Sequence, residues 1–299
     1  MIDTIKIYSP EKSDLWKTKE STSYANYAER CIENMTIKER YDGTTIEGSL
    51  GRFLQGHNYD MDFKKIPAAL EKLEALTGLD LHKAVLRRVD YAETLIIQNP
   101  CCNYLPLFRG YPRKKVAHYY NSDMTLETVQ YFTKSGGVGF CIYDKNKETK
   151  DTGGKCPEIY KDCNVLRLEY RLENQTGIKN NFGGENISPW QLTKTATYTH
   201  LRKLFLDFYN GIEKGGRAVF VNLQGGNVTS RDVLLLLAES YRQCNSNYYY
   251  QTLDQLQSIG LLSNKERQRL KDKENTNKAN VSISDTNPLI KELDSLLGV

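Results

Sequence analysis

The segment NVLRLEYRLE, at positions 164–173, has the clearest strand pattern in the chain, because apolar and charged side chains alternate from Leu166 to Glu173. In a β-strand this alternation separates two faces: Leu166, Leu168, Tyr170 and Leu172 on one, and Arg167, Glu169, Arg171 and Glu173 on the other. The charged face is typical of a solvated sheet surface with cross-strand ion pairs. The segment therefore predicts a strand with one apolar face and one charged face.

Other strand patterns surround this one in the first half of the chain. They cover residues 2–8 (IDTIKIY), 84–97 (AVLRRVDYAETLII), 128–133 (TVQYFT) and 138–144 (VGFCIYD). Residues 40–60 resemble a hairpin, residues 23–35 are a helix or an irregular crossover, and residues 99–115 have the prolines of a loop. Apolar spacing predicts a helix from Ile66 to a stop at Gly78.

Beyond about residue 185 the pattern becomes helical. Helices are predicted over 188–211, 229–243, 248–262, 263–273 and 287–299. We therefore expect a strand-rich domain over 1–180, a helical C-terminal subdomain over 185–271, and a flexible linker with a short terminal helix over 272–299. The fold class is α+β, with a central antiparallel sheet of about five strands and flanking helices.

Composition excludes several classes of protein. The chain has 299 residues, of which 39% are hydrophobic and 26% charged, as in soluble globular proteins. The net charge of +4 permits nucleic-acid binding without indicating it. Seven cysteines form no C-x-x-C pair, which favours a reduced, cytoplasmic protein over a zinc ribbon or a disulfide framework. We expect neither a signal peptide nor a membrane span.

The segment FLQGHN, at 53–58, suggests a metal site. In an extended segment Gln55 and His57 lie two residues apart, on the same face of a strand, where an amide oxygen and an imidazole can reach one divalent cation. A solvated polar face is the ordinary interpretation of such a pair. A metal role therefore depends on carboxylates from elsewhere in the chain.

Three further residues in the strand-rich half could take part in chemistry. Asp90 lies in an apolar strand and needs a partner such as Arg88 if it is buried, although a strand-edge ion pair explains it equally well. Glu169 lies between Arg167 and Arg171. Tyr143 shares a face with Lys145 if its strand continues, and a nearby ammonium lowers the cost of deprotonating a phenol.

Together these motifs resemble a known family. FLQGHN, RRVDYAET, GFCIYDKNKE and LRLEYRLE, in this order and after the opening MIDTIKI, are similar to the replication initiators of filamentous phages, the gene II/X type. Rolling-circle plasmid initiators, within the superfamily of HUH-like endonucleases, look similar. The resemblance covers residues 1–175. Such proteins nick one strand of a duplex origin through a tyrosine that becomes joined to the 5′-phosphate and leaves a free 3′-hydroxyl.

The resemblance implies a set of site residues. Tyr143 would be the nucleophile and Lys145 its positive neighbour, while Gln55 and His57 would be metal ligands. Gln55 departs from the pair of histidines usual in the superfamily, so the site should need carboxylates. Asp90 and Glu169 are the choices, with Glu47 and Glu93 in reserve. Such a donor set suits Mg²⁺ or Mn²⁺.

The same resemblance implies origin DNA as the partner, single-stranded at the nick and duplex at its flanks, in the cytoplasm of a bacterial host. Arg113, Lys114 and Lys115 are candidates for phosphate contacts. The chain has no phosphate-loop motif, so unwinding would come from a host helicase, and a polymerase would extend the 3′-hydroxyl. Two alternatives stay open: a non-enzymatic origin-binding protein, and a relaxase-like or transposase-like nickase acting on other DNA.

Overall fold

The computed structural model describes residues 1–13, 22–23, 27–133, 137–215, 218–221, 257, 263–268, 281–284 and 287–299. The chain divides into two compact units, the first formed by Met1–Glu213 with Val299 and the second by Lys214–Gly298. The first unit therefore contains the sheet and also the described helices that follow it in the chain, up to residue 211. The helices predicted over 229–243 and 248–262 lie almost entirely outside the described residues.

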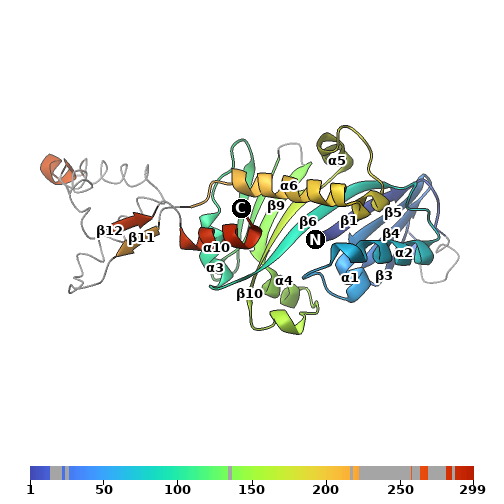
Figure 1. Ribbon diagram of the computed structural model, residues 1–299, viewed down its shortest axis with the longest axis horizontal. Helices are drawn as coiled ribbons and strands as arrows, with labels where there is room; N and C mark the ends of the chain where they lie inside the picture. Colours follow the sequence, from blue (N-terminus) through green and yellow to red (C-terminus); the bar gives the residue numbers. More distant parts are fainter. Residues whose placement is uncertain are drawn as a thin grey trace. The chain divides into compact units, whose positions relative to one another are not determined.

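A single large antiparallel sheet forms the centre of the first unit (Figure 1). Its ten described strands lie in the order β2-β3-β4-β5-β1-β6-β10-β9-β8-β7. They are β1 (Ile2–Ser9), β2 (Thr22–Ser23), β3 (Ala28–Ile32), β4 (Met35–Arg40), β5 (Gly43–Ser49), β6 (Val85–Ile97), β7 (Lys115–Tyr120), β8 (Leu126–Phe132), β9 (Val138–Asp144) and β10 (Asn164–Leu172).

The prediction of an α+β fold is therefore confirmed, whereas the number of about five strands is wrong. The five predicted strands form the middle of the sheet and part of one side. Strands β3, β4 and β5 extend it on the other side, and β3 falls in the segment predicted as a helix or a crossover. In β4 only Met35 and Ile37 are buried and apolar, and in β5 Ile46 is the one large apolar residue that is buried, so these short strands have weaker sequence patterns than β10.

The helices connect and cover the strands. They are α1 (Leu50–Gln55), α2 (Ile66–Thr77), α3 (Cys101–Tyr104), α4 (Lys145–Asp151), α5 (Gln175–Asn181) and α6 (Thr195–Gly211), with 3-10 turns η2 (Phe63–Lys65), η3 (Leu105–Leu107), η4 (Glu158–Tyr160) and η5 (Pro189–Thr193). The predicted helix at 66–78 is confirmed as α2, which Gly78 ends in the left-handed conformation at φ 69°.

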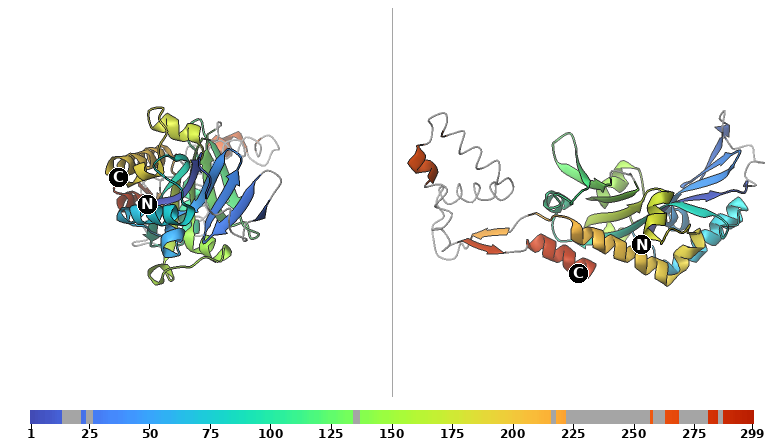
Figure 2. Two further views of the ribbon diagram at one scale, coloured as in Figure 1. Left: turned by 90° about the vertical axis from the view of Figure 1, so that its right-hand side faces the viewer. Right: turned by 90° about the horizontal axis from the view of Figure 1, so that it is seen from above.

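One face of the sheet is apolar and packs against α6. Tyr91, Tyr170, Phe140 and Tyr131 are paired in register across four neighbouring strands. The rings of Phe205 and Phe208 on α6 pack against this row at centroid distances of 4.9–6.1 Å. Figure 2 (right) shows α6 and α2 on one side of the sheet. The opposite face carries the residues one position away in each strand, and it is the polar face.

The second unit is described only in part. Strands β11 (Ala218–Val221) and β12 (Val281–Ser284) pair antiparallel. The predicted terminal helix is confirmed as α10 (Pro288–Leu297), which begins at a cap by Asn287 and ends at Gly298. Within the described residues no helix is long and apolar enough to cross a bilayer.

Candidate functional site: a polar cavity on the charged face of the sheet

The charged face of β10 is buried, contrary to the expectation of a solvated surface. Arg167 is fully buried at 0% exposure and Glu169 at 3%. The Arg167 guanidinium donates from Nη2 to Asp3 Oδ2 at 2.6 Å and from Nε to Glu169 Oε1 at 3.3 Å. Two further donations from Nη1 reach the carbonyl oxygen of Asn58 at 2.8 Å and Thr94 Oγ1 at 2.6 Å. The hydrogen bonds that this buried guanidinium would make with water are thus made with protein acceptors.

Arg171 and Arg88 complete a network of arginines and carboxylates on this face. Arg171 donates from Nε and Nη2 to Glu169 Oε2 at 3.0 and 2.6 Å. Arg88 binds both oxygens of Asp90 at 2.7–3.2 Å, as a bidentate pair. We call the set of Asp3, Arg88, Asp90, Arg167, Glu169 and Arg171 the charge network. It joins β1, β6 and β10, whose pairing brings these side chains together.

Tyr143 reaches the charge network from the neighbouring strand β9. It lies opposite Arg167 in the β9–β10 register, and its hydroxyl donates to Glu169 Oε1 at 2.5 Å. Burial and the adjacent negative charge of Glu169 raise the pKa of the Tyr143 hydroxyl well above its usual range. Tyr143 is therefore a protonated hydrogen-bond donor in this arrangement.

The carboxylates of the network differ in their acidity. Burial alone would raise the pKa of Glu169, but Arg171 and Arg167 outweigh it and hold the pKa at about 2. For Asp90 burial is the larger influence, and it raises the pKa to about 7 against the opposing effect of Arg88. Glu169 is thus firmly ionised, whereas the pKa of Asp90 is raised toward neutral pH.

A polar cavity of about 300 Å³ opens beside these groups. Its lining includes Tyr143, Glu169, Arg171, Arg88 and Asp90 from the sheet, and Arg52 of α1 and Asn58 of the following loop. Three guanidinium groups and a phenol that converge on one cavity can bind a phosphodiester and place a hydroxyl nucleophile beside it.

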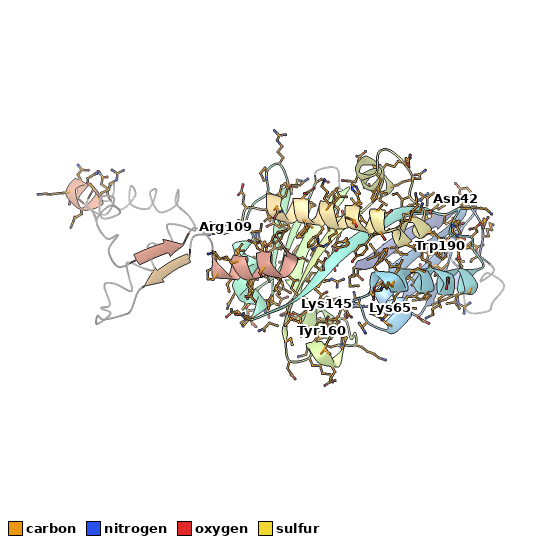
Figure 3. All side chains as sticks on the ribbon, viewed as in Figure 1. Asp42, Lys65, Arg109, Lys145, Tyr160 and Trp190 are labelled. Atoms are coloured by element: carbon orange, nitrogen blue, oxygen red, sulfur yellow. The ribbon has the colours of Figure 1, made fainter. Side chains whose placement is uncertain are left out.

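Lys145 lies close to Tyr143, but for a different reason from the one predicted. Strand β9 ends at Asp144, whose side chain caps α4, so Lys145 begins a helix and does not share a strand face with Tyr143. Its ammonium is buried, binds Glu148 Oε2 at 2.6 Å, and lies 6.0 Å from the Tyr143 ring centre. Figure 3 shows Lys145 near Tyr160, and both side chains pack against Tyr59.

The prediction that FLQGHN is a strand is wrong. Residues 50–55 form α1, because Ser49 caps the helix by accepting a hydrogen bond from the Arg52 amide, and Leu50 and Phe53 are buried one turn apart. Gly56 then ends the helix in the left-handed conformation at φ 81°. Gln55 and His57 therefore flank a helix terminus, and their side chains approach each other to 3.4 Å between Nε2 and Nδ1.

Gln55 and His57 have local partners. Lys65 (Figure 3) donates from Nζ to Gln55 Oε1 at 3.2 Å, so an ammonium occupies the oxygen that was predicted to bind a metal. His57 Nδ1 lies 3.8 Å from Asp60 Oδ1, and burial lowers the pKa of its imidazole. Neither Gln55 nor His57 lines the cavity.

The predicted metal ligands do not form a ligand cluster. Asp90 and Glu169 lie in the charge network with arginine partners, and Gln55 bonds Lys65. In the part of the chain that the structure describes, no three His, Cys, Asp or Glu side chains are arranged to hold a metal ion. The residues present thus do not fit the predicted metal site in this conformation.

The reserve carboxylates lie in other surroundings. Glu47 pairs with Lys6 at 2.8 Å and with Arg88 at 3.6 Å, at the edge of the charge network. Glu93 accepts a hydrogen bond from Tyr91 at 2.5 Å and lies 3.9 Å from Arg202 of α6. Tyr91 in turn contacts the ring of Tyr198 on α6, so a second group of phenols and a carboxylate exists on the helix-covered face.

Sequence reasoning missed several residues that line the cavity, among them Asp3, Asn58 and Arg52. Asp3 binds Arg167, Ser49 and Asn58, and is buried at 3% exposure. Asp3 shares the alternation phase of the buried Ile5 and Ile7, and a carboxylate in this apolar phase was the signal that could have identified it.

The predicted phosphate contacts lie before and at the start of β7. Arg113 is exposed and has a left-handed backbone at φ 63°, and Lys115 is exposed on the edge strand. Lys114 lies over the rings of Tyr111 and Phe208 at 5.3 and 5.5 Å, and burial lowers its pKa. The structure thus leaves Arg113 and Lys115 accessible.

Comparison with known proteins gives one family. The family model for the N-terminal region of the phage gene II replication-associated protein matches residues 5–199, which include every residue of the cavity except Asp3 and Thr4. No curated protein sequence matches the chain. Among solved structures, a rolling circle replication initiator protein from Geobacillus stearothermophilus is similar over 80% of this chain and 95% of that chain, at 11% identity and a TM-score of 0.38. The family of the chain is therefore shown by the family model and not by the structural similarity.

Proposed function

The chain belongs to the phage family of gene II replication-associated proteins, as its sequence motifs predicted, and from this premise we propose that it initiates rolling-circle replication by nicking origin DNA. The observation that carries the proposal is that Tyr143 lines a cavity together with arginines and that its hydroxyl is bonded to Glu169. A tyrosine beside an anion-binding cavity suits transesterification of a phosphodiester.

In the proposed step, the Tyr143 oxygen attacks the phosphorus while its proton is released to water, because Glu169, whose pKa is about 2, accepts the hydrogen bond of the hydroxyl without keeping its proton. The bond between phosphorus and the 3′-oxygen breaks, and the 3′-oxygen takes a proton from water. The products are a 5′-phosphotyrosine and a free 3′-hydroxyl, from which strands can later be rejoined by the reverse reaction. Because the pKa of Tyr143 is raised, the proton must leave as the new bond forms.

The arginines would bind the phosphate. Arg88 and Arg171 are partly exposed, at 26% and 21% of their side chains, and both line the cavity. Each guanidinium has five N–H donors, so it can bind a phosphate oxygen while keeping its carboxylate partner. Lys145 adds a positive charge near the phenol, which favours the negative charge that develops during attack.

A requirement for Mg²⁺ or Mn²⁺ stays a prediction. The proposed step uses no metal ion, because Gln55, His57, Asp90 and Glu169 have other partners and do not converge. A metal-dependent reaction would require these residues to rearrange when DNA binds. Comparing Mn²⁺ with EDTA in the nicking assay tests this requirement directly.

DNA binding would place phosphates at Arg113 and Lys115, with the strand to be cut on the polar face of the sheet. A host helicase would then unwind the duplex and a polymerase would extend the 3′-hydroxyl. These two partners follow from the proposed product, a nicked strand with a free 3′ end.

The test incubates wild type, Tyr143→Phe and Tyr198→Phe with a library of single-stranded oligonucleotides, in Mn²⁺ and in EDTA. The readout is a protein–DNA adduct that survives denaturation. We expect an adduct with wild type and with Tyr198→Phe, and none with Tyr143→Phe. Loss of the adduct only in Tyr198→Phe would mean that the nucleophile lies on the other face of the sheet. Duplex binding without any adduct would favour the origin-binding alternative.

A further inference from the structure

Strand β7 is an exposed edge that carries aromatic and basic residues. It ends the described sheet on one side, pairing with β8. Tyr119 is 50% exposed and Tyr120 is 53% exposed, and Lys115 and His118 are exposed as well. The strand KVAHYY contains no acidic residue, and Glu127 of β8 pairs with Lys147. Lysine is common on edge strands, whereas two neighbouring exposed tyrosine rings offer stacking surface to a binding partner.

The strand register connects this edge to the cavity. Arg167 lies opposite Tyr143, Tyr143 lies opposite Thr128, and Thr128 lies opposite Tyr119. Residues opposite one another in a sheet share a face, so Tyr119 is on the same face as Tyr143. Neighbouring strands lie about 4.8 Å apart, which places the two backbone positions about 10 Å from each other. Between them, Thr128 presents a small, half-buried side chain.

The two exposed tyrosines of β7 point to opposite faces. Side chains alternate along a strand, so Lys115 and Tyr119 share the face of Tyr143, whereas Tyr120 shares the opposite face with His118. The register shift after Tyr119 adds its extra residue to β8, so the alternation along β7 itself is unbroken. Tyr119 therefore lies at one end of a row that begins in the cavity, and Tyr120 does not. The chain thus contains two neighbouring tyrosines of nearly equal exposure that differ in the face they occupy.

We propose that the face of β7 carrying Lys115 and Tyr119 binds single-stranded DNA that flanks the phosphate at Tyr143, with one base stacked on the Tyr119 ring. This inference rests on the proposed function, which places the phosphate at Tyr143. An unpaired strand fits this surface because its bases offer free faces to a phenol ring, while its phosphates attract Lys115. Stacking does not depend on the identity of the base, so this edge would hold the strand without reading its sequence.

The experiment measures the affinity of the full chain for a fluorescein-labelled oligo-dT strand by fluorescence anisotropy. We expect Tyr119→Ala to weaken binding on the order of tenfold, the loss typical of one base–aromatic stack. Tyr120→Ala is the matched control and should bind within about twofold of wild type. Tyr119→Phe should retain affinity, since it keeps the ring, and urea unfolding of each variant checks that the fold is intact.

A second set of probes locates the stacked base. Oligo-dT strands with one abasic position each should lose affinity for wild type at one position and show no such loss with Tyr119→Ala. Equal affinities of Tyr119→Ala and Tyr120→Ala would overturn the inference. If wild type and Tyr119→Ala bind and form the covalent adduct equally well, the inference falls while the nicking function stands. If wild type binds no oligo-dT strand but still forms the covalent adduct with the oligonucleotide library, the inference falls alone; if it neither binds nor forms the adduct, both fall.

Discussion

The charge network and the loop of Gln55 to Asn58 contain similar polar side chains but are held in different ways. The network joins residues from β1, β6 and β10, and Arg167 at its centre is fully buried. Gln55 and His57 instead contact each other, Asp60 and Lys65, all within ten residues along the chain. Sequence motifs suggested that the two regions form one metal site. The structure shows that long-range pairing organises the first and local contacts the second.

Asn58 is the point where the two regions meet. Its side chain donates to both oxygens of Asp3, and its carbonyl accepts a hydrogen bond from Arg167. The loop is thus fixed to the network through Asn58 and not through His57 or Gln55. The variants below separate these contributions.

The largest effect should come from Arg167→Met, which breaks the centre of the network. Asp3 and Glu169 would lose their shared cation while they stay buried, and such a change typically costs about 3–5 kcal/mol in the free energy of unfolding. Urea unfolding measures this cost. Lys38→Met removes the partly exposed Lys38–Glu29 pair as a control and should cost far less than Arg167→Met. Equal costs for the two variants would mean that burial does not distinguish the network.

Asn58→Ala should have the next largest effect. The change removes two donations to the buried carboxylate of Asp3, and an unsatisfied buried acceptor costs about 1–3 kcal/mol. The same urea titration gives the value. A cost near zero would show that Ser49 and Arg167 satisfy Asp3 without the loop, and that the loop is not fixed to the network.

Asp90 should make stability depend on pH. Its pKa is raised from 3.8 to about 7, so between these values the folded chain holds a proton that the unfolded chain has lost. Its contribution to stability is therefore complete below the lower value and falls as the pH rises through the higher one, by at most about 1.4 kcal/mol per pH unit. Glu169, whose pKa is lowered from 4.5 to about 2, has the opposite dependence: its contribution is complete above about pH 4.5 and is lost as the pH falls toward 2.

The contribution of Asp90 is isolated by measuring the free energy of unfolding of wild type and Asp90→Asn between about pH 5 and pH 8, because the amide does not titrate. We expect wild type to lose stability relative to Asp90→Asn as the pH rises. Parallel curves would mean that the Arg88 pair keeps Asp90 ionised throughout this range.

The smallest effect should come from Gln55→Ala in the loop. Its hydrogen bonds to Asp60 and Lys65 are exposed, so the free energy of unfolding should change by about 0.5 kcal/mol or less. A cost comparable to that of Asn58→Ala would contradict the distinction between the two regions.

Strong local patterns predicted much of the fold. The alternation at 164–173 and the helical spacing at 66–78 identified β10 and α2 nearly to the residue, because each has one continuous apolar face. The helix at 50–55 was missed because Ser49 and Gly56, the residues that begin and end it, were interpreted as parts of a hairpin and a strand. Charge on β10 suggested solvent exposure, since a single sequence does not show that Asp3 lies beside Arg167.

The candidate site was predicted only in part, because strand pairing brings its residues together and a single sequence does not show that pairing. The position of Tyr143 beside Glu169 follows from the pairing of two strands that the sequence identified, although not from either strand alone. Lys145 is near Tyr143 through the start of α4, and Asp90 is beside Arg88 as expected. The metal ligands depended on placing Gln55 and His57 on a strand, and that premise was wrong.

The central claim is that Tyr143 is the nucleophile on the polar face of the sheet. The most direct test is to digest the covalent DNA adduct of the wild-type protein with trypsin and identify the DNA-linked peptide by mass spectrometry. Residues 135–145 form one tryptic peptide, whose only tyrosine is Tyr143. We expect the modification on this peptide. Modification of a peptide that contains Tyr198, or of any other tyrosine, would contradict the account.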